Sequence, residues 1–494
     1  MPRSIIVIGA GVGGLAAAIR LAYAGFEVTV LEKNRQVGGT LSEYQAGGFR
    51  WDIAPAPFYS RSLLESLLSD IGRELDDYLR LLPIDPQTRY FFPDGASLDL
   101  CRDWARTANE LSRLAPDAVA GYLRFLAYAA DLRQMRGLGF AGGESLAGAP
   151  GPSSLFRAWL RAGPFRNAYG VSRRFVGSEK LRQALVNCIS HSGGSPFAVP
   201  AAFSELAHLI LSDGLWYPRD GFSAIPLTLQ RLAHELGVAM RRNCPVERIE
   251  IERGRAIGVM LEKNGDCLRA DAVVSNLDAI STARYLLPEG AIAPPALRSL
   301  AQRPMSSSAF IMLLGIRGTF PNLAHQNIFF SDDYRKEFDQ LFRRGLMPVD
   351  PTITLTISCK SEPLHAPVNQ ENWLIKVSAP PISERIDWAT ARHVIRDRVL
   401  SSLEERHGLD LRDRIRVERH LKPLDLQRMT GAWRGALNGE LPHGRRAALA
   451  QPQIRSPHVQ RLYHVGGAVV PGGGLPQALL SAQEAAALMQ RDLR

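Results

Sequence analysis

Ser4-Ile5-Ile6-Val7-Ile8-Gly9-Ala10-Gly11-Val12-Gly13-Gly14 is the stretch of sequence that decides the fold. Its first five residues are almost wholly apolar and β-branched, which predicts a strand buried in a parallel sheet. The segment from Leu15 to Ala24 has the composition of an apolar helix, and Phe26 to Leu31 predicts a second strand. Glu32 follows that strand directly. The order of strand, glycine turn, helix, strand and acid predicts a βαβ unit.

The glycines of this unit have separate physical uses. Gly9 permits a tight turn, Gly11 lets the backbone approach a pyrophosphate, and Gly14 lets the helix and the strand pack closely. The free N–H groups at the start of the helix, around Gly13, favour phosphate charge. Glu32 stands where a carboxylate can accept hydrogen bonds from ribose hydroxyls. The unit therefore predicts a dinucleotide site, since a glycine turn without a ligand would leave the position of Glu32 unexplained.

A second glycine pair indicates which dinucleotide is bound. Gly38, Gly39 and Thr40 follow shortly after Glu32 and Lys33. Close approach of the backbone to a second stretch of the cofactor is the physical use of such a pair. This arrangement favours FAD over NAD, and we expect Lys33, Gly38, Gly39 and Thr40 at the cofactor.

The composition is that of a soluble globular chain. At 494 residues, two or three domains are expected, and 46% hydrophobic with 22% charged residues excludes disordered, collagen-like and coiled-coil chains. The 59 Lys and Arg against 49 Asp and Glu give a net charge of +10. This excess can serve an anionic membrane surface, an anionic cofactor or merely a solvated basic face. No nucleic-acid motif accompanies it, so no nucleic-acid partner is expected.

The cysteines, the histidines and the hydropathy indicate the cellular compartment, metal content and membrane relation to expect. The five cysteines are far apart, which favours free thiols in a reducing, cytoplasmic compartment. The histidines show no metal-ligand spacing, so no metal is expected. The apolar stretch from Ser306 to Ile316 is too short to span a bilayer. The regular glycines and Arg20 argue against a signal peptide at the N-terminus, so we expect a soluble or peripheral protein.

Several motifs resemble those of the flavin amine oxidase and carotenoid desaturase superfamily. Glu32 to Thr40 is similar to its acid, glycine pair and basic residue, with Thr40 at the basic position. Phe49 to Pro55 is similar to a second motif, in which Ala54 replaces a glycine. Tyr217 to Gly221, with Asp220 for a glycine, and Val274 to Asp278 resemble two later motifs. The resemblance implies that Pro55 and the backbone of Val246 contact the FAD.

The C-terminal region adds a further match. Leu462 to Ala468 predicts a strand that runs into a glycine-rich turn, and Gln477 to Asp492 predicts a helix. Such a helix start can meet the flavin edge, where the reduced ring holds negative charge. Gly472 to Pro476 resembles the desaturases that act late in carotenoid pathways, while Val470 replaces the family's histidine. The residues expected at the cofactor here are Gly466, Gly467, Gly473 and Leu475.

The resemblance covers nearly the whole chain and implies an α/β fold with two discontinuous domains. A Rossmann-type FAD/NAD(P)-binding domain would comprise residues 1–80, 215–290 and 445–494, as in flavin amine oxidases. Residues 81–214 and 291–444 would form an α+β substrate domain. Within the first of these parts, Leu155 to Phe175 is basic and aromatic. That segment predicts either a helix in a lipid interface or a helix pair packed on the core with a solvated basic face.

The implied function is desaturation of a carotenoid or another long apolar polyene. In that reaction a hydride passes to flavin N5 and a proton leaves the neighbouring carbon, giving a new C=C bond. Quinone or oxygen would accept the electrons, and the enzyme would lie peripherally on the inner face of the cell membrane. The sequence identifies no catalytic residue, although His191, His325 and His464 are candidate acid–base groups.

Three alternatives use the same scaffold. The nearest is a carotenoid oxygenase or ketolase that oxidises a terminal methyl or ring carbon. An amine oxidase and a non-catalytic carrier similar to the Rab GDP-dissociation inhibitors are the others, and the intact glycine set argues against the carrier.

Overall fold

The computed structural model describes residues 2–53, 58–59, 61–135, 166–263, 265–441, 443–444, 453–469 and 473–493. Its helices are α1 (Val12–Tyr23), α2 (Arg61–Ser69), α3 (Trp104–Leu114), α4 (Ala118–Met135), α6 (Ala168–Ser172), α7 (Glu179–Ser190), α8 (Glu205–Asp213), α9 (Ala224–Glu235), α10 (Ala279–Ser281), α11 (Pro294–Ala301), α12 (Tyr334–Phe338), α13 (Trp388–His407), α14 (Pro423–Thr430) and α15 (Gly474–Asp492). Its strands are β1 (Ser4–Ile8), β2 (Glu27–Leu31), β3 (Glu43–Ala46), β4 (Phe49–Asp52), β5 (Leu81–Pro83), β6 (Thr88–Phe91), β7 (Ser97–Leu100), β8 (Trp216–Pro218), β9 (Ala239–Arg241), β10 (Val246–Glu252), β11 (Arg255–Leu261), β12 (Cys267–Arg269), β13 (Ala272–Ser275), β14 (Ser308–Arg317), β15 (Gln326–Phe329), β16 (Ile353–Ile357), β17 (Gln370–Ala379), β18 (Ile415–Leu421) and β19 (Leu462–His464).

A five-stranded parallel sheet, in the order β19-β13-β1-β2-β9, carries the N-terminal motif. Ile5 and Val7 of β1 point into a core shared with α1, α9 and α15. Ile6 and Ile8 point to the opposite face, where the antiparallel sheet β10-β11-β12 packs. Both faces of β1 are therefore covered, which explains why its sequence is a nearly uninterrupted run of apolar residues. The predicted βαβ unit is confirmed.

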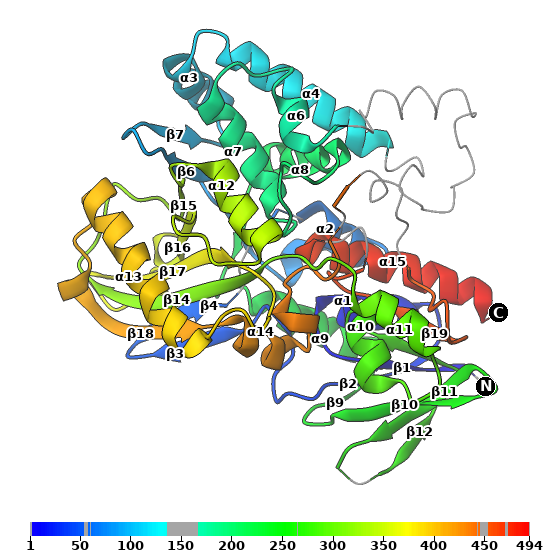
Figure 1. Cartoon of the computed structure of the whole chain (residues 1–494). Helices are drawn as coiled ribbons and strands as arrows, with labels where there is room; N and C mark the ends of the chain where they lie inside the picture. The colour runs from blue at the N-terminus through cyan, green and yellow to red at the C-terminus, as the bar shows by residue number, and fades with distance from the viewer. Residues whose placement is uncertain are drawn as a thin grey trace.

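This sheet gathers strands from distant parts of the chain. β1 and β2 come from the N-terminus, β9 and β13 from the middle, and β19 from near the C-terminus (Figure 1). Helix α1 begins at Val12, three residues earlier than its apolar run predicts, because Gly13 and Gly14 lie inside its first turn. A Cβ on Gly14 would lie 2.1 Å from the carbonyl oxygen of Gly9. Only a glycine lets the helix pack this close to the end of β1.

A second, seven-stranded sheet has the order β18-β14-β17-β16-β15-β6-β7. Its pairs are antiparallel except β15 with β6. Phe310 and Trp373 face α13, while Ile311 and Leu374 face β4 and α14. The apolar stretch noted in the sequence from residue 306 is thus largely the buried strand β14. Within the described ranges, no helix is long and apolar enough to cross a membrane.

Helices α3, α4, α6, α7 and α8 cluster at the top of Figure 1, beyond β6 and β7. Of the basic aromatic segment from Leu155 to Phe175, residues 155–165 lie outside the described residues. The described part contains α6, whose Ala168 and Val171 are buried, and leaves Arg173 and Arg174 exposed. These ten residues therefore pack one face on the core and turn basic side chains outward.

Candidate cofactor cleft

A cleft of about 360 Å³ lies at the carboxyl ends of β1, β2 and β13. This is where parallel sheets of this type bind ligands. Of the residues predicted from the sequence, those that line it are Gly9, Gly11, Gly13, Glu32, Lys33, Gly38, Gly39, Thr40, Val246, Gly467 and Leu475. Gly14, Gly466 and Gly473 do not line the cleft. Pro55 and Val470 lie outside the described residues.

The glycine turn after β1 and the pair Gly38 and Gly39 form one wall of the cleft. The backbone N–H of Gly38 donates to the carbonyl of Ala10 at 2.9 Å. A Cβ on Gly39 would lie 3.7 Å from Cα of Gly11, so the two loops touch. Gly38 has a φ of +120°, and a Cβ there would also lie 2.9 Å from the carbonyl oxygen of Leu41. Backbone alone therefore faces a ligand along this wall, as a cofactor that approaches closely requires.

The N-terminus of α1 faces the same space. Gly11 is its N-cap in an extended conformation, and no side chain among the described residues caps this end. The N–H groups of the first turn are therefore available to an anion, and the helix dipole adds partial positive charge. This end of the cleft fits the pyrophosphate of a dinucleotide.

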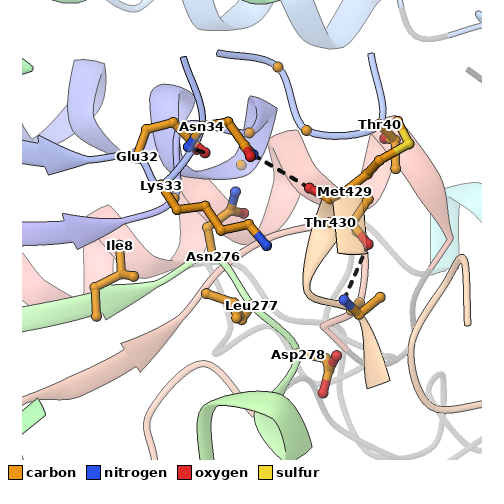
Figure 2. A pocket seen from close by; sticks show the side chains of 18 of the residues that line it. Ile8, Glu32, Lys33, Asn34, Thr40, Asn276, Leu277, Asp278, Met429 and Thr430 are labelled. Carbon is orange, nitrogen blue, oxygen red and sulfur yellow. Dashed lines mark hydrogen bonds between the residues drawn. The ribbon is translucent and has the colours of Figure 1, made fainter. Parts of the chain in front are cut away.

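Glu32 lies at the carboxyl end of β2, where the βαβ unit ends. Its side chain is buried, with one carboxylate oxygen accepting the N–H of Ala10 and the other that of Asn34, both at 2.8 Å. These bonds hold the carboxylate at the cleft, where Figure 2 shows it beside Lys33 and Asn34. Because a carboxylate has about four acceptor sites, it retains capacity for ribose hydroxyls. The residues present fit a dinucleotide such as FAD.

The amide of Asn276 fills the space between the glycine turn and the end of β19. A Cβ on Gly11 would lie 2.6 Å from its Nδ2, and one on Gly466 would lie 2.7 Å from its Oδ1. Gly466 also has a φ of +119°, and its N–H donates to the hydroxyl of Ser481 at 2.9 Å. Gly466 thus supports the cleft from behind. The sequence places Asn276 in a family motif but does not single it out as a site residue.

A wall that sequence reasoning missed comes from residues 426–437. Lys33 Nζ donates to the carbonyl of Arg428 at 3.0 Å. Asn34 Nδ2 lies 3.5 Å from the carbonyl of Met429 (Figure 2). From the opposite side, the carboxylate of Asp278 accepts the N–H of Trp433 at 2.8 Å. The residues of this wall are Leu426, Met429, Thr430, Ala432, Gly435, Ala436 and Leu437. The sequence feature that could have indicated turns here is the pair Gly431 and Gly435. In the structure both glycines have a positive φ.

A second cavity of about 90 Å³ adjoins the cleft and shares Thr40, Leu41, Leu437, Gly474 and Leu475 with it. We call it the polar cavity, because seven serine, histidine, lysine and asparagine residues line it: Ser190, His191, Ser307, Ser308, Lys376, Ser378 and Asn438. Burial lowers the pKa of Lys376 to about 8. Burial, and secondarily the charge of Lys376, lowers the pKa of His191 to about 3, so His191 is neutral at physiological pH.

The three candidate histidines lie in three different places. His191 lines the polar cavity, whereas Nδ1 of His325 lies 2.7 Å from the hydroxyl of Ser361 at a separate small cavity. His464 lines another cavity, with Arg303 and Glu440. Burial lowers the pKa of His325 to about 3 and that of His464 to about 4. In the part of the chain described, no cluster of three or more potential metal ligands occurs.

Comparison with known proteins shows which family the chain is similar to. A family model described as flavin containing amine oxidoreductase matches residues 12–353. The chain is 36% identical over 488 residues to the 4,4'-diapolycopene oxygenase of Methylomonas sp, with 97% of each chain covered. It is 34% identical over 496 residues to the zeta-carotene-forming phytoene desaturase of Myxococcus xanthus, covering 97% of this chain and 92% of the relative.

Among solved structures, the cyclohexylamine oxidase from Brevibacterium oxydans IH-35A matches over 100% of both chains. Its TM-score is 0.60 at 15% sequence identity, which supports the fold. The fold predicted from the sequence, a Rossmann-type cofactor domain with a flavin amine oxidase-like substrate domain, is confirmed. Cleft geometry, family model and end-to-end similarity agree: the chain belongs to the flavin-containing amine oxidoreductase family, in its carotenoid desaturase and oxygenase branch, and is an FAD-dependent oxidoreductase.

Proposed function

We propose that the enzyme is a carotenoid desaturase that removes two hydrogens from a long polyene and leaves a new C=C bond. The observation that carries the proposal is similarity along 97% of the chain to enzymes named for carotenoid chemistry, together with a cofactor cleft whose glycines and acid are all present.

The chemistry supplied by bound FAD is two-electron oxidation, the uptake of a hydride from an allylic carbon. This chain's residues bind and orient both reactants. The α1 N-terminus, Glu32 and the glycines at 9, 11, 38 and 39 would hold the cofactor, while Phe58, Tyr59 and Phe222 form the apolar part of the adjoining cavity. A conjugated polyene delocalises positive charge, so the departing proton needs only a weak acceptor. Neutral His191 is a side chain of this kind beside the cleft.

A second candidate is oxygenation of a terminal carbon of the polyene, since the Methylomonas relative is named an oxygenase. The polar cavity favours this candidate, because it places an ammonium, an imidazole and hydroxyl groups beside the cofactor cleft. A hydrocarbon chain alone makes no use of such groups.

We also propose peripheral association with the cytoplasmic face of the cell membrane. The net charge of +10 suits an anionic surface, and carotenoids dissolve only in lipid. Quinone or oxygen would then accept the electrons. Cosedimentation with anionic and neutral vesicles tests this part, and equal binding to both would contradict it.

Expression in a lycopene-producing bacterial host, followed by chromatography and mass analysis of the pigments, tests the reaction. A product lighter by hydrogen pairs, with a red-shifted spectrum, is expected from a desaturase. A product that gains oxygen mass supports the second candidate. A Gly11→Val variant is the matched control, because its Cβ would lie 2.6 Å from Nδ2 of Asn276 at the cofactor. Pigment unchanged by a yellow, FAD-loaded enzyme would refute lycopene as substrate.

A further inference from the structure

Lys376 occupies an unusual place in the seven-stranded sheet. On β17 it lies two residues after Leu374 and directly across from Ile311 of β14, and both neighbours are buried and apolar. Residues two apart on a strand share a face, so Lys376 projects from the same apolar face as Leu374, which packs against β4 and α14. A buried ammonium on such a face carries a desolvation cost, which an apolar residue would avoid.

The rest of the polar cavity is held in place by hydrogen bonds between remote segments. Asn438 Nδ2 donates to the carbonyl of His191 at 3.1 Å, and the N–H of Ser307 donates to the carbonyl of Gly193 at 2.9 Å. The N–H of Leu437 donates to the carbonyl of Ser307 at 3.2 Å. These bonds join the end of α7, the residues before β14 and the loop after α14. The walls are therefore formed before any ligand binds.

The size and position of the polar cavity limit what it can hold. Its volume of about 90 Å³ has room for a few water-sized groups, far less than a long polyene needs. Thr40, Leu41 and Leu475 line both this cavity and the cofactor cleft. A chain that presents a carbon to the cofactor can thus place its terminal group in the polar cavity.

We propose that the polar cavity binds an oxygenated end of the substrate chain, a hydroxyl or a carbonyl group, with Lys376 as its principal hydrogen-bond donor. This inference rests on the proposed function, since it takes the substrate to be a long polyene. Ser378 lies on the same face of β17 as Lys376 and adds a hydroxyl, and His191 adds a neutral imidazole that can donate or accept.

The protonation states agree with this assignment. With a pKa of about 8, Lys376 is mostly an ammonium at pH 7, and it remains so at lower pH. A charge-assisted hydrogen bond in a site shielded from water is among the stronger ones proteins make. Its contribution corresponds to about a 10- to 100-fold difference in dissociation constant.

Binding titrations on the FAD-loaded full chain test the inference. The probes are three linear polyenes of equal length, which end in a methyl, a hydroxymethyl or an aldehyde group. Dissociation constants are measured anaerobically in one detergent by fluorescence quenching, with the bound FAD reduced beforehand so that it cannot take a hydride from a probe. The wild type is expected to bind the two oxygenated polyenes at least about tenfold more tightly than the hydrocarbon. Lys376→Met should remove most of this preference while leaving the hydrocarbon's affinity unchanged.

Two further variants keep the test decisive. Ser378→Ala is a smaller change in the same cavity and should reduce the preference partially, which covers the case that Lys376→Met does not fold. Lys336→Met alters an exposed lysine on α12 and should behave as the wild type. Equal binding of the three probes to the wild type, or a preference that survives both cavity variants, would overturn the inference and leave the proposed function standing. Failure of all three probes to bind would overturn both.

Discussion

Glu32 shows how one side chain serves both the fold and the cofactor site. Its two carboxylate oxygens accept the N–H groups of Ala10 and Asn34, so it joins the glycine turn after β1 to the loop after β2. The same carboxylate lines the cleft where a ribose would lie. Replacing Glu32 therefore affects both FAD retention and the stability of the fold. The two effects can be separated, because the backbone N–H groups of Ala10 and Asn34 need an acceptor but not a negative charge.

We expect Glu32→Gln to weaken FAD retention by about 10- to 100-fold, because a neutral amide makes weaker bonds to ribose hydroxyls. Glu32→Ala should in addition lower the free energy of unfolding by about 1–3 kcal/mol, since buried N–H groups would lose their acceptor. Flavin absorbance per chain and urea denaturation measure the two effects. Glu247→Gln, an exposed residue of β10, is the control. Undiminished flavin content in Glu32→Gln would show that the ribose contact lies elsewhere.

At the scale of elements, the cofactor site depends on how closely α1 approaches its neighbours. A Cβ on Gly14 would lie 2.1 Å from the carbonyl oxygen of Gly9, and one on Gly13 would lie 2.7 Å from Cα of Gly466. Both contacts are with backbone, which cannot turn aside as a flexible side chain can. The helix is therefore seated against the ends of β1 and β19, and its N-terminus is aimed at the cleft.

Gly14→Ala should consequently displace α1 and lower the free energy of unfolding by about 1–3 kcal/mol, the usual cost of overpacking. Flavin content should fall with it, because the anion-binding end of the helix moves. Tyr23→Ala on the same helix is the matched control, as Tyr23 is 57% exposed and should change stability little. A Gly14→Ala protein with wild-type denaturation midpoint and flavin content would contradict this account of the close packing.

At the scale of the whole molecule, a buried polar network joins three distant segments. The carboxylate of Asp52 on β4 bonds to the hydroxyl of Tyr217 and accepts the N–H of Phe222. The hydroxyl of Tyr217 in turn lies 3.1 Å from Nδ1 of His365. Burial raises the pKa of Asp52 to about 6, although the bonds from Tyr217 and Phe222 oppose the shift.

This pKa predicts a pH dependence with a definite sign. Because the folded pKa lies above the unfolded value, the folded state binds the proton more tightly, and Asp52 adds stability as pH falls through about 6 toward 4. Relative to Asp52→Asn, the wild type should gain about 1 kcal/mol between pH 7 and pH 5. Urea denaturation of both flavin-loaded proteins at the two pH values measures it. A stability difference that stays constant, or changes in the opposite direction, would show that Asp52 is not protonated in this range.

Much of the cofactor domain followed from local sequence. β1, α1 and β2 are consecutive, and their periodicity and glycines are properties of short stretches, so the predicted unit is correct to within three residues at the helix start. The strands β9, β10, β11 and β13 were likewise predictable, because each is a short apolar or alternating run. The predicted domain boundaries and all the predicted contacts with the cofactor, those of Gly473 and Pro55 included, stay predictions.

The sequence by itself determined that the chain has a dinucleotide-binding βαβ unit, since strand, turn and helix are set by neighbouring residues. Only the tertiary structure decided what surrounds that unit. Lys33 bonds to Arg428, nearly 400 residues later in the chain, and Asn276 fits between Gly11 and Gly466. Lys376 and Leu475 line the same cavity. Contacts of this kind depend on how whole sheets pack, and no local pattern of residue types encodes which distant loop will close a cleft.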